Sequence, residues 1–593
     1  MKRIPAQAGG DRQLMAGQAA ELDIQAKDLP EGTHVQWSMG DGHKDAGPSL
    51  QYAWQRPGKY NLQVTVTDSD GQKRSDKALV EVSRPLLHDI LPAAVPWVLW
   101  MDKPGEGIPR IPLLLERMLA SGQDANSALA AMREILGFDP FTREGLQAAG
   151  LDPDGTVAMV GWGEDEGVLL AAALTEGDGG LETLQRLLAQ GGSLQVTPSE
   201  KNLNIQIMKA EGQEQVLGAY AFFRGYVWFA LESGKQNPVA ALQALLASSA
   251  GLLKDQADFR DALKAREGVA AMSFFMSKEW MRKESAEEMS KDEAKIWDSV
   301  GFFRMDLDQD DRGLALTLRL GMAGGSAGRV AATFKSRGEV PPLHHLVEAD
   351  RHGFLKLSLD LFGFAETVME ISGQTDQWKE MLASFEELKQ GTGIDLRTGL
   401  MDNLGDTYFL TLRIKPGGLL ATVISQGQSG TAPADLFEAT LFVQVKDSKA
   451  LDLVIEGLQK LASKGPVALE PNGPGRWRLM VPEMPLSMVL HDGFVVVATS
   501  AEAADRAVKA LSASGVEKSR WPQVLQSADH QLLVLDLARM VTDFEQAKTP
   551  PDMAFIKAMV LGVLAKVSGL GLAWVDVVAS PEMLTFTFRL DSK

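Results

Sequence analysis

The stretch that decides the fold of the N-terminal region is Trp37-Ser38-Met39-Gly40-Asp41-Gly42. It ends a short alternating run in a tight turn, where the glycines accept a positive φ and the aspartate can bond nearby backbone amides. Similar alternating stretches, each bounded by turn residues, lie on both sides of it and predict further strands. These stretches are residues 20–24, 34–39, 49–54, 60–67 and 78–82. The pattern predicts a small β-sandwich.

A second series of signals surrounds this turn. Tyr52 precedes the turn Pro57-Gly58-Lys59-Tyr60, and the run Val64-Thr65-Val66-Thr67-Asp68 is followed by Asp70-Gly71. Together with the W-x-x-G-D-G turn and the alternating stretches, this series covers about 70 residues and resembles the PKD domain, an immunoglobulin-like sandwich. The resemblance implies a domain over residues 1–85 that lies outside the cytoplasm and acts as a spacer or an interaction module. It identifies no ligand.

Two residue types in this module have both a functional and a structural interpretation. Trp37 and Trp54 could form a platform for a carbohydrate, but sandwiches of this class contain a core tryptophan, so a place in the core is the favoured interpretation. The aspartates beside Gly42 and Gly71 could bind calcium, but aspartates are also common formers of turns. We expect structural roles for all of them.

The rest of the chain carries an internal repetition. A strand-like run at 95–101 ends in Asp102 and leads into expected helices at 111–120 and 126–136. A second run at 354–359 ends in Asp360 and leads into expected helices at 361–372 and 377–390. After the helices come the related signatures Gly137-Phe138-Asp139 and Gly393-Ile394-Asp395. The repetition predicts two α+β units with mainly antiparallel sheets, over residues 86–345 and 346–593.

Each half continues with a hairpin that turns at a glycine, Arg224-Gly225 in the first and Asp492-Gly493 in the second. The second strand of each hairpin runs into an expected helix, with Asn237 or Ser500 as its N-cap. The fold class predicted for the whole chain is therefore multidomain, an all-β immunoglobulin-like sandwich followed by two repeated α+β units.

The order of elements in the repeated part, and Gly393-Ile394-Asp395 before Leu404-Gly405-Asp406 in particular, is similar to an uncharacterised family of exported bacterial proteins known only as a domain of unknown function. The resemblance implies a location in the cell envelope or at the cell surface. That family carries no established activity, so no site residue is implied by it.

Composition narrows the possible partners. The chain has 593 residues, with 59 basic and 78 acidic side chains and a net charge of −19, so it repels a phosphate backbone and nucleic acid is excluded as a ligand. It has no cysteine, which excludes disulfides and thiolate chemistry. No apolar run reaches the roughly 18 residues of a spanning helix, and residues 1–10 lead into no signal peptide, although a lipid anchor upstream of Met1 stays possible.

One cluster has the residue types of a metal site. His344, His345, Glu348 and His352 follow one another closely, and imidazoles and carboxylates are ligands that zinc accepts. Their spacing matches no recognised ligand pattern, and Pro341-Pro342 just before them indicates an exposed connector. No catalytic motif and no cofactor motif stands out elsewhere in the chain.

We therefore expect a non-enzymatic, exported bacterial binding or scaffold protein of the periplasm or cell surface. Its expected partner is a protein or another component of the envelope, met through the PKD-like module. A carrier of a lipid or other apolar ligand, held in the duplicated α+β body, is the alternative. A metal-dependent hydrolase that uses the histidine cluster is the third hypothesis.

Overall fold

The structure is a computed structural model that describes the chain in stretches separated by gaps. They are residues 6–24, 29–110, 137–162, 167–175, 194–199, 204–210, 216–231, 237–248, 251–265, 270–285, 298–309, 313–322, 325–334, 350–393, 395–415, 437–447, 468–481, 484–512, 531–546, 570–580 and 582–592, with isolated positions between them. The chain divides into two units, one formed by residues 1–111 and 131–276, the other by residues 112–130 and 277–593.

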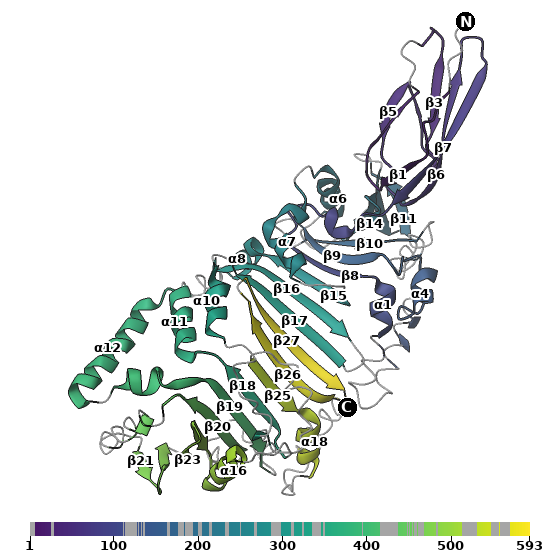
Figure 1. Ribbon diagram of the computed structural model, residues 1–593. Helices are drawn as coiled ribbons and strands as arrows, with labels where there is room; N and C mark the ends of the chain where they lie inside the picture. The colour runs from purple at the N-terminus through teal and green to yellow at the C-terminus, as the bar shows by residue number, and fades with distance from the viewer. Residues whose placement is uncertain are drawn as a thin grey trace. The chain divides into compact units, whose positions relative to one another are not determined.

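The first unit begins with a β-sandwich (Figure 1). One sheet has five strands in the order β1-β7-β6-β3-β4, and the other pairs β2 with β5. The strands are β1 (Arg12–Met15), β2 (Ala20–Asp23), β3 (His34–Ser38), β4 (Lys44–Ala46), β5 (Ser49–Tyr52), β6 (Gly58–Thr67) and β7 (Lys73–Ser83). Five of them overlap the predicted stretches, so the sandwich expected from the sequence is confirmed.

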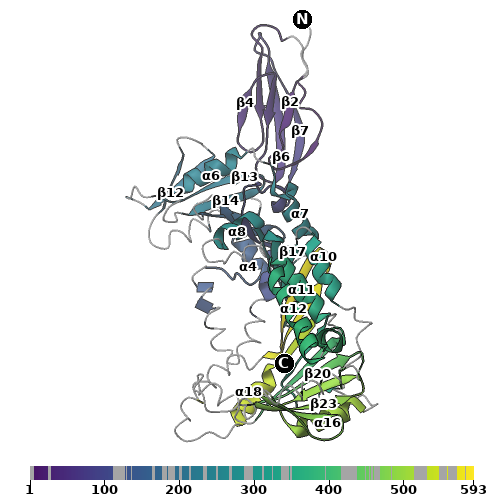
Figure 2. The ribbon, with the colours of Figure 1, turned by 90° about the vertical axis from the view of Figure 1, so that its left-hand side faces the viewer.

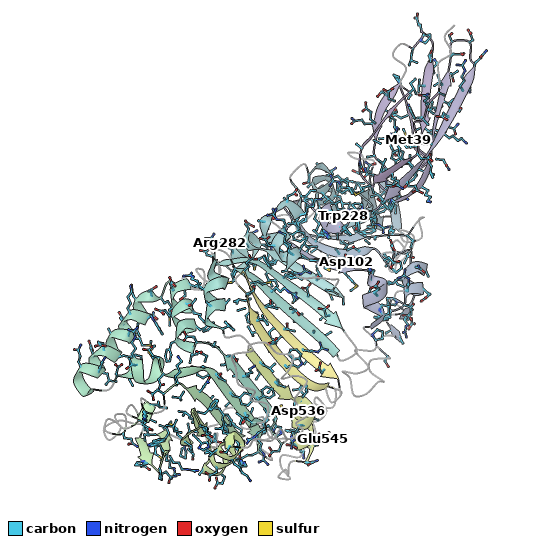
Figure 3. All side chains as sticks on the ribbon, in the orientation of Figure 1. Met39, Asp102, Trp228, Arg282, Asp536 and Glu545 are labelled. Atoms are coloured by element: carbon cyan, nitrogen blue, oxygen red, sulfur yellow. The ribbon has the colours of Figure 1, made fainter. Side chains whose placement is uncertain are left out.

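The core of the sandwich forms because successive side chains of each strand point to opposite sheet faces. Trp37 and Trp54 are both buried in it. The Trp37 indole donates to the Gly47 carbonyl at 3.0 Å, and that of Trp54 donates to the Met39 carbonyl at 3.0 Å. Figure 3 marks Met39 among the side chains of the sandwich. The structural interpretation of the two tryptophans therefore holds, since each has its polar atom satisfied inside the core.

The turn that follows Trp37 requires a glycine at position 40. Gly40 has φ +84°, and a Cβ atom on it would lie 2.7 Å from the backbone nitrogen of Asn61. Asp41 accepts a hydrogen bond from the backbone N–H of His43 at 3.0 Å. The aspartate thus forms the turn, as expected from the sequence.

An antiparallel sheet follows the sandwich in the first unit. Its order is β15-β8-β9-β10-β14-β13-β12-β11. The strands are β8 (Trp97–Asp102), β9 (Thr156–Trp162), β10 (Gly167–Ala172), β11 (Leu194–Pro198), β12 (Ile205–Ala210), β13 (Val216–Phe223), β14 (Tyr226–Leu231) and β15 (Met272–Ser277). Trp228 of β14 is fully buried within this sheet (Figure 3).

Short helices accompany this sheet. They are η1 (Leu87–Asp89), α1 (Pro104–Gly107), η2 (Ile108–Arg110), α4 (Arg143–Ala148), α6 (Pro238–Ala247), η3 (Leu253–Asp255) and α7 (Ala257–Lys264). Helix α6 packs on β13 and β14, as Figure 2 also shows. Asn237 caps it, because its side chain accepts hydrogen bonds from the N–H groups of Val239 and Ala240. This confirms the predicted N-cap, while the helices expected at 111–120 and 126–136 lie largely outside the described residues.

The second unit contains a longer antiparallel sheet. Its described strands follow the order β16-β17-β27-β26-β25-β18-β19-β20-β24-β23-β22-β21. They are β16 (Val300–Gln309), β17 (Gly313–Met322), β18 (Gly353–Ser358), β19 (Leu404–Ile414), β20 (Phe437–Val445), β21 (Ala468–Pro471), β22 (Arg476–Val481), β23 (Met484–His491), β24 (Phe494–Ala498), β25 (Gln531–Asp536), β26 (Leu570–Ala579) and β27 (Met583–Ser592).

The helices described in the second unit are α8 (Lys278–Ser285), α10 (Ser326–Thr333), α11 (Leu361–Ile371), α12 (Thr375–Thr392), α16 (Ala501–Ser512) and α18 (Leu537–Gln546), with a π-helical turn η7 (Arg397–Met401). Helix α16 packs on β20, β23 and β24 and buries Phe442 beneath it. The predicted helices at 361–372 and 377–390 are confirmed by α11 and α12. Ser500 accepts a hydrogen bond from the N–H of Ala503, which confirms the other predicted N-cap.

The two sheets share one strand order. Starting from β15 and from β25, each sheet runs through eight strands whose sequence numbers correspond step by step, as β8 to β18, β9 to β19 and β14 to β24. The helix after the hairpin covers it in both units, since α6 contacts β13 and β14 and α16 contacts β23 and β24. Both sheets are therefore antiparallel layers with helices packed on a face.

None of the helices in the described part of the chain is long and apolar enough to cross a membrane.

Candidate functional site

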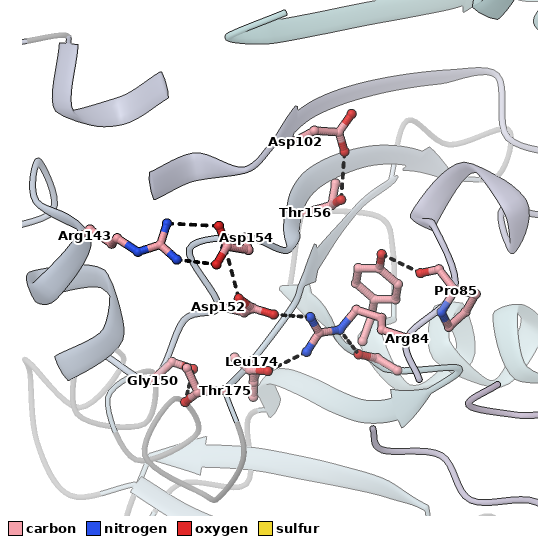
Figure 4. Close-up of polar contacts among 12 residues, drawn as sticks. Arg84, Pro85, Asp102, Arg143, Gly150, Asp152, Asp154, Thr156, Leu174 and Thr175 are labelled. Atoms are coloured by element: carbon pink, nitrogen blue, oxygen red, sulfur yellow. Dashed lines mark hydrogen bonds and ion pairs between the residues drawn. The ribbon is translucent and has the colours of Figure 1, made fainter. Parts of the chain in front are cut away.

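The segment that leaves the sandwich is fixed to the sheet of the first unit by Arg84 (Figure 4). Its guanidinium donates to the backbone carbonyls of Gly225 at 3.0 Å and Leu174 at 2.6 Å, and it pairs with the carboxylate of Asp152. The Arg84 side chain is only 15% exposed. One cation thus satisfies three acceptors that belong to separate loops of the sheet, which makes this contact costly to break.

Tyr226 adds a second bond to the same segment. Its hydroxyl donates to the Pro85 carbonyl at 3.0 Å, and burial raises the pKa of this hydroxyl to about 12. The group therefore stays protonated, and stays a donor, over the whole physiological range. Because proline has no N–H, its carbonyl is the backbone group that this position offers for anchoring.

The hairpin turn between β13 and β14 contacts the sandwich directly. Arg224 and Gly225 both have positive φ, 51° and 90°, as a two-residue type I′ turn requires. Their backbone N–H groups both donate to Gln55, at 3.1 Å to its side-chain Oε1 and at 2.8 Å to its main-chain carbonyl. Gln55 precedes the Pro57-Gly58 turn of the sandwich. The turn predicted from the sequence is confirmed, and its exposed amides are used to bind the neighbouring domain.

A cavity of about 660 Å³ lies where these contacts bring the two parts of the first unit together. We call it the junction cleft. Its sandwich wall comes from the loops beside β5 and β6, and its sheet wall comes from β12, β13 and adjoining residues. The lining residues that carry the argument are Asp41, Tyr52, Arg56, Lys59 and Tyr60 on the first wall and Asn204, Gln206, Tyr220 and Phe222 on the second.

The polar groups on the sandwich wall are held in place. The Tyr52 hydroxyl donates to the Asp41 carboxylate at 2.6 Å, and the Tyr60 hydroxyl donates to the Arg56 carbonyl at 2.8 Å. Burial, followed by the hydrogen bond to Asp41, raises the pKa of Tyr52 well above its usual value, so this phenol remains neutral. The ring of His43 stacks on Tyr52 with centroids 5.1 Å apart. Both tyrosine rings are therefore oriented before any ligand arrives.

The cations at the cleft have partners too. The Arg56 guanidinium lies 3.6 Å from the centroid of the Phe222 ring, a cation–π contact that joins the two walls. The Lys59 ammonium pairs with the Glu81 carboxylate at 2.7 Å. The cleft therefore combines aromatic rings with amide, hydroxyl and paired charged groups.

The predicted metal cluster is not brought together among the described residues. His344, His345 and Glu348 lie outside them, and only His352 can be placed. It is buried, its Nδ1 accepts the Ile414 N–H at 3.0 Å, and its Nε2 contacts the Asp543 carboxylate at 2.7 Å. Burial lowers the pKa of His352. Within the described part of the chain no three His, Cys, Asp or Glu residues are grouped as a metal ion would need.

The sequence pattern does not predict the cleft. Trp37 and Trp54, the candidates for an aromatic platform, are core residues, whereas Tyr52 and Tyr60 line the cleft. In the sequence, Tyr60 belongs to the turn Pro57-Gly58-Lys59-Tyr60, and this motif indicates a turn and no ligand. The signal that could have found the second wall is the alternation of Tyr220 and Phe222, which places two aromatic rings on one face of β13.

Comparison with known families identifies the first domain. Residues 4–83 match the PKD domain family, so the N-terminal sandwich is a PKD domain. PKD domains are characteristic of extracellular and cell-surface proteins and act as interaction modules. No significant match was found among curated proteins.

Solved structures show only distant likeness. Two crystal forms of TP0453, forms IV and III, each have a TM-score of 0.24 and 11% identity, over 42% and 41% of this chain and 86% and 81% of theirs. A quinonprotein alcohol dehydrogenase-like protein from Bacteroides thetaiotaomicron VPI-5482 has a TM-score of 0.12 and 9% identity, over 52% of this chain and 67% of its own.

Proposed function

We propose that this chain is a non-enzymatic, exported binding protein of the bacterial envelope, and that the junction cleft is its binding site. The observation that carries the proposal is the construction of the cleft from two parts of the first unit. Arg84 and Gln55 fix the PKD domain to the sheet through five hydrogen bonds, and the walls between them are aromatic and polar. A module that served only as a spacer would need no such lined cavity.

The expected location is the periplasm or the cell surface, which agrees with the usual setting of PKD domains. The expected partner is a protein or another component of the envelope. The acidic net charge of −19 keeps the protein soluble and away from nucleic acid.

A photo-crosslinking experiment tests the binding site. A benzophenone amino acid replaces Tyr60 in the cleft of the full chain or, as the control, Lys73 at the distal end of the β6–β7 hairpin. After irradiation with an envelope fraction, we expect a discrete adduct from the Tyr60 position and none from the Lys73 position. Equal labelling from both positions, or none from Tyr60, would contradict the proposal.

We also infer that the α+β parts of the two units are one fold used twice. The inference is supported by the shared order of eight strands and by the equivalent type I′ turns at Arg224-Gly225 and Asp492-Gly493. An experimental structure in which the strand orders of the two sheets differ would remove it.

A second candidate function, the binding of an apolar ligand, is favoured by one row of side chains in the second unit. Leu533, Val575 and Phe588 lie directly opposite one another on β25, β26 and β27, and the row continues through Leu316 and Leu307. Phe588 is 43% exposed and Leu533 is 38% exposed. Antiparallel sheets with a wet face normally alternate apolar residues inward and polar residues outward, so an apolar row at the more exposed face is unusual.

Titration of the full chain with a fluorescent fatty acid tests this second candidate. Saturable binding that Phe588→Ser weakens several-fold, and that Leu86→Ser leaves unchanged, would support it. Leu86 is a suitable control because it is an exposed leucine of the first unit. The absence of saturable binding would remove the candidate.

A further inference from the structure

The chemistry of the junction cleft indicates the class of its ligand, given the proposed function of the cleft as the binding site. Aromatic rings and neutral hydrogen-bonding groups face the same cavity. The rings of Tyr52, Tyr60 and Phe222 line the cavity, with His43 stacked on Tyr52 and Arg56 on Phe222. Asn204 and Gln206 carry amide groups there, and the Thr175 hydroxyl donates to the Gly150 carbonyl at 3.2 Å. A ligand that fits has apolar C–H faces together with many neutral donors and acceptors at its edges, which is the surface of a sugar ring.

The charges at the cleft indicate that the ligand is neutral. Arg56, Lys59 and Asp41 are the charged residues in its lining, and Glu81, which is not in the lining, is the partner of Lys59. Lys59 is paired with Glu81 at 2.7 Å, Arg56 stacks on Phe222, and Asp41 accepts from the Tyr52 hydroxyl. A charged ligand would have to displace one of these contacts, whereas a neutral one leaves them in place.

The size and rigidity of the cleft suit a short oligomer. Its volume of about 660 Å³ lies within the range of roughly 300–1,000 Å³ in which protein sites hold small organic ligands. The two tyrosine hydroxyls are already bonded, to Asp41 and to the Arg56 carbonyl. Because the rings are pre-oriented, less side-chain entropy is lost when a ligand stacks on them.

A peptide is a poorer fit for the sheet wall. Strand β12 is paired with β11 and β13, and β13 is paired with β12 and β14, so neither offers a free edge to which a peptide strand could add. The wall therefore presents side chains instead of main-chain donors and acceptors. We propose that the junction cleft binds a neutral oligosaccharide, with Tyr60 as a stacking platform and Asn204 and Gln206 as hydrogen-bonding groups.

Calorimetric titration of the full chain with cellotetraose, chitotetraose and maltotetraose tests the proposal. We expect saturable binding of at least one tetrasaccharide. Its affinity should change little when salt is raised from about 50 to 500 mM, because a neutral ligand makes no screened ion pair.

Two variants and a matched control locate the binding. Gln206→Ala should weaken it about five-fold, as expected for one lost hydrogen bond, and Tyr60→Leu about ten-fold. Gln195→Ala, on the neighbouring strand β11 and outside the cleft lining, should leave it unchanged. Thermal unfolding of each variant shows whether it is folded.

The possible results distinguish a wrong ligand class from a wrong binding site. If no tetrasaccharide binds, or if Gln206→Ala and Gln195→Ala change the affinity equally, the proposal that the ligand is an oligosaccharide is wrong. Saturable binding of a proline-rich peptide such as decaproline, if Tyr60→Leu abolishes it, would show that the ligand is a peptide and not a sugar. The cleft would still be the binding site. A missing Tyr60 crosslink with envelope material would count against the cleft itself.

Discussion

The hairpins β13–β14 and β23–β24 have the same turn in different surroundings. Both turns place two residues at positive φ, Arg224 and Gly225 at 51° and 90°, Asp492 and Gly493 at 46° and 75°. In the first hairpin the turn is covered, since Arg224 and Gly225 donate to Gln55 and the Gly225 carbonyl accepts from Arg84. In the second, the Gly493 carbonyl accepts from the Val445 N–H, while the Asp492 side chain is 66% exposed.

This difference shows that the local sequence determines the conformation of the turn, whereas residues distant in the chain determine its contacts. The glycine and its partner residue determine the turn, because only a few residues tolerate positive φ in succession. The use of the turn depends on residues far away in the chain, Gln55 and Arg84, which supply partners for its backbone groups. A turn becomes a domain joint only where such partners exist.

Removal of Arg84 should have the largest effect on the joint. Arg84→Ala leaves the carboxylate of Asp152 and the carbonyls of Leu174 and Gly225 without their partner. Because these groups are partly buried, we expect a loss of about 2–3 kcal/mol in the free energy of unfolding of the first unit. The measurement is denaturant unfolding followed by tryptophan fluorescence.

Arg143→Ala is the matched control for this variant. Arg143 also pairs with a carboxylate, that of Asp154, but both side chains are exposed, so their pair contributes little (Figure 4). If Arg143→Ala destabilised the first unit as much as Arg84→Ala, Arg84 would be one surface charge among others and not the anchor of the joint.

The two turn glycines provide the next comparison. Alanine at either position must adopt a positive φ, at a cost of about 1 kcal/mol. A Cβ atom on Gly225 would also lie 3.0 Å from Cγ of Arg84, whereas on Gly493 its nearest contact is the Val445 carbonyl at 3.8 Å. Gly225→Ala should therefore cost about 1–2 kcal/mol more than Gly493→Ala in unfolding experiments. Equal costs would show that the joint adjusts to the added methyl group.

The sequence predicted the local features of both regions and missed what depends on contacts between distant residues. The turns at Gly225 and Gly493 and the caps Asn237 and Ser500 were predicted because each is decided within a few residues. The PKD domain was predicted from its turn motifs. The cleft was not, because Tyr60 and Phe222 come to line one cavity only through the long-range contacts of Gln55 and Arg84. The strand order was not predicted either, since pairing joins strands as distant as β17 and β27.

Acid should weaken the second unit through His352. Burial lowers the pKa of this imidazole, and Arg539 nearby lowers it further, while the hydrogen bond to Asp543 acts in the opposite sense. The unfolded chain therefore binds the proton more readily than the folded one, so stability is full above the ordinary pKa of 6.5 and falls as pH drops below it. Denaturant unfolding at pH 7 and pH 5 measures the loss.

The variant His352→Gln isolates this contribution. It removes the titrating group, so the change in unfolding free energy between pH 7 and pH 5 should be smaller than in the natural protein. Should both proteins lose the same stability, His352 would have no part in the acid response.

The smallest effect is expected at the exposed turn itself. Asp492 has φ 46°, and asparagine tolerates this conformation as well as aspartate does. Its carboxylate contacts only His491 among the described residues, at 3.2 Å. Asp492→Asn should therefore change the unfolding free energy of the second unit by less than about 0.5 kcal/mol, as is usual for surface substitutions. A loss comparable to that of Gly225→Ala would mean that the second turn is anchored as firmly as the first, and the contrast between the two hairpins would fail.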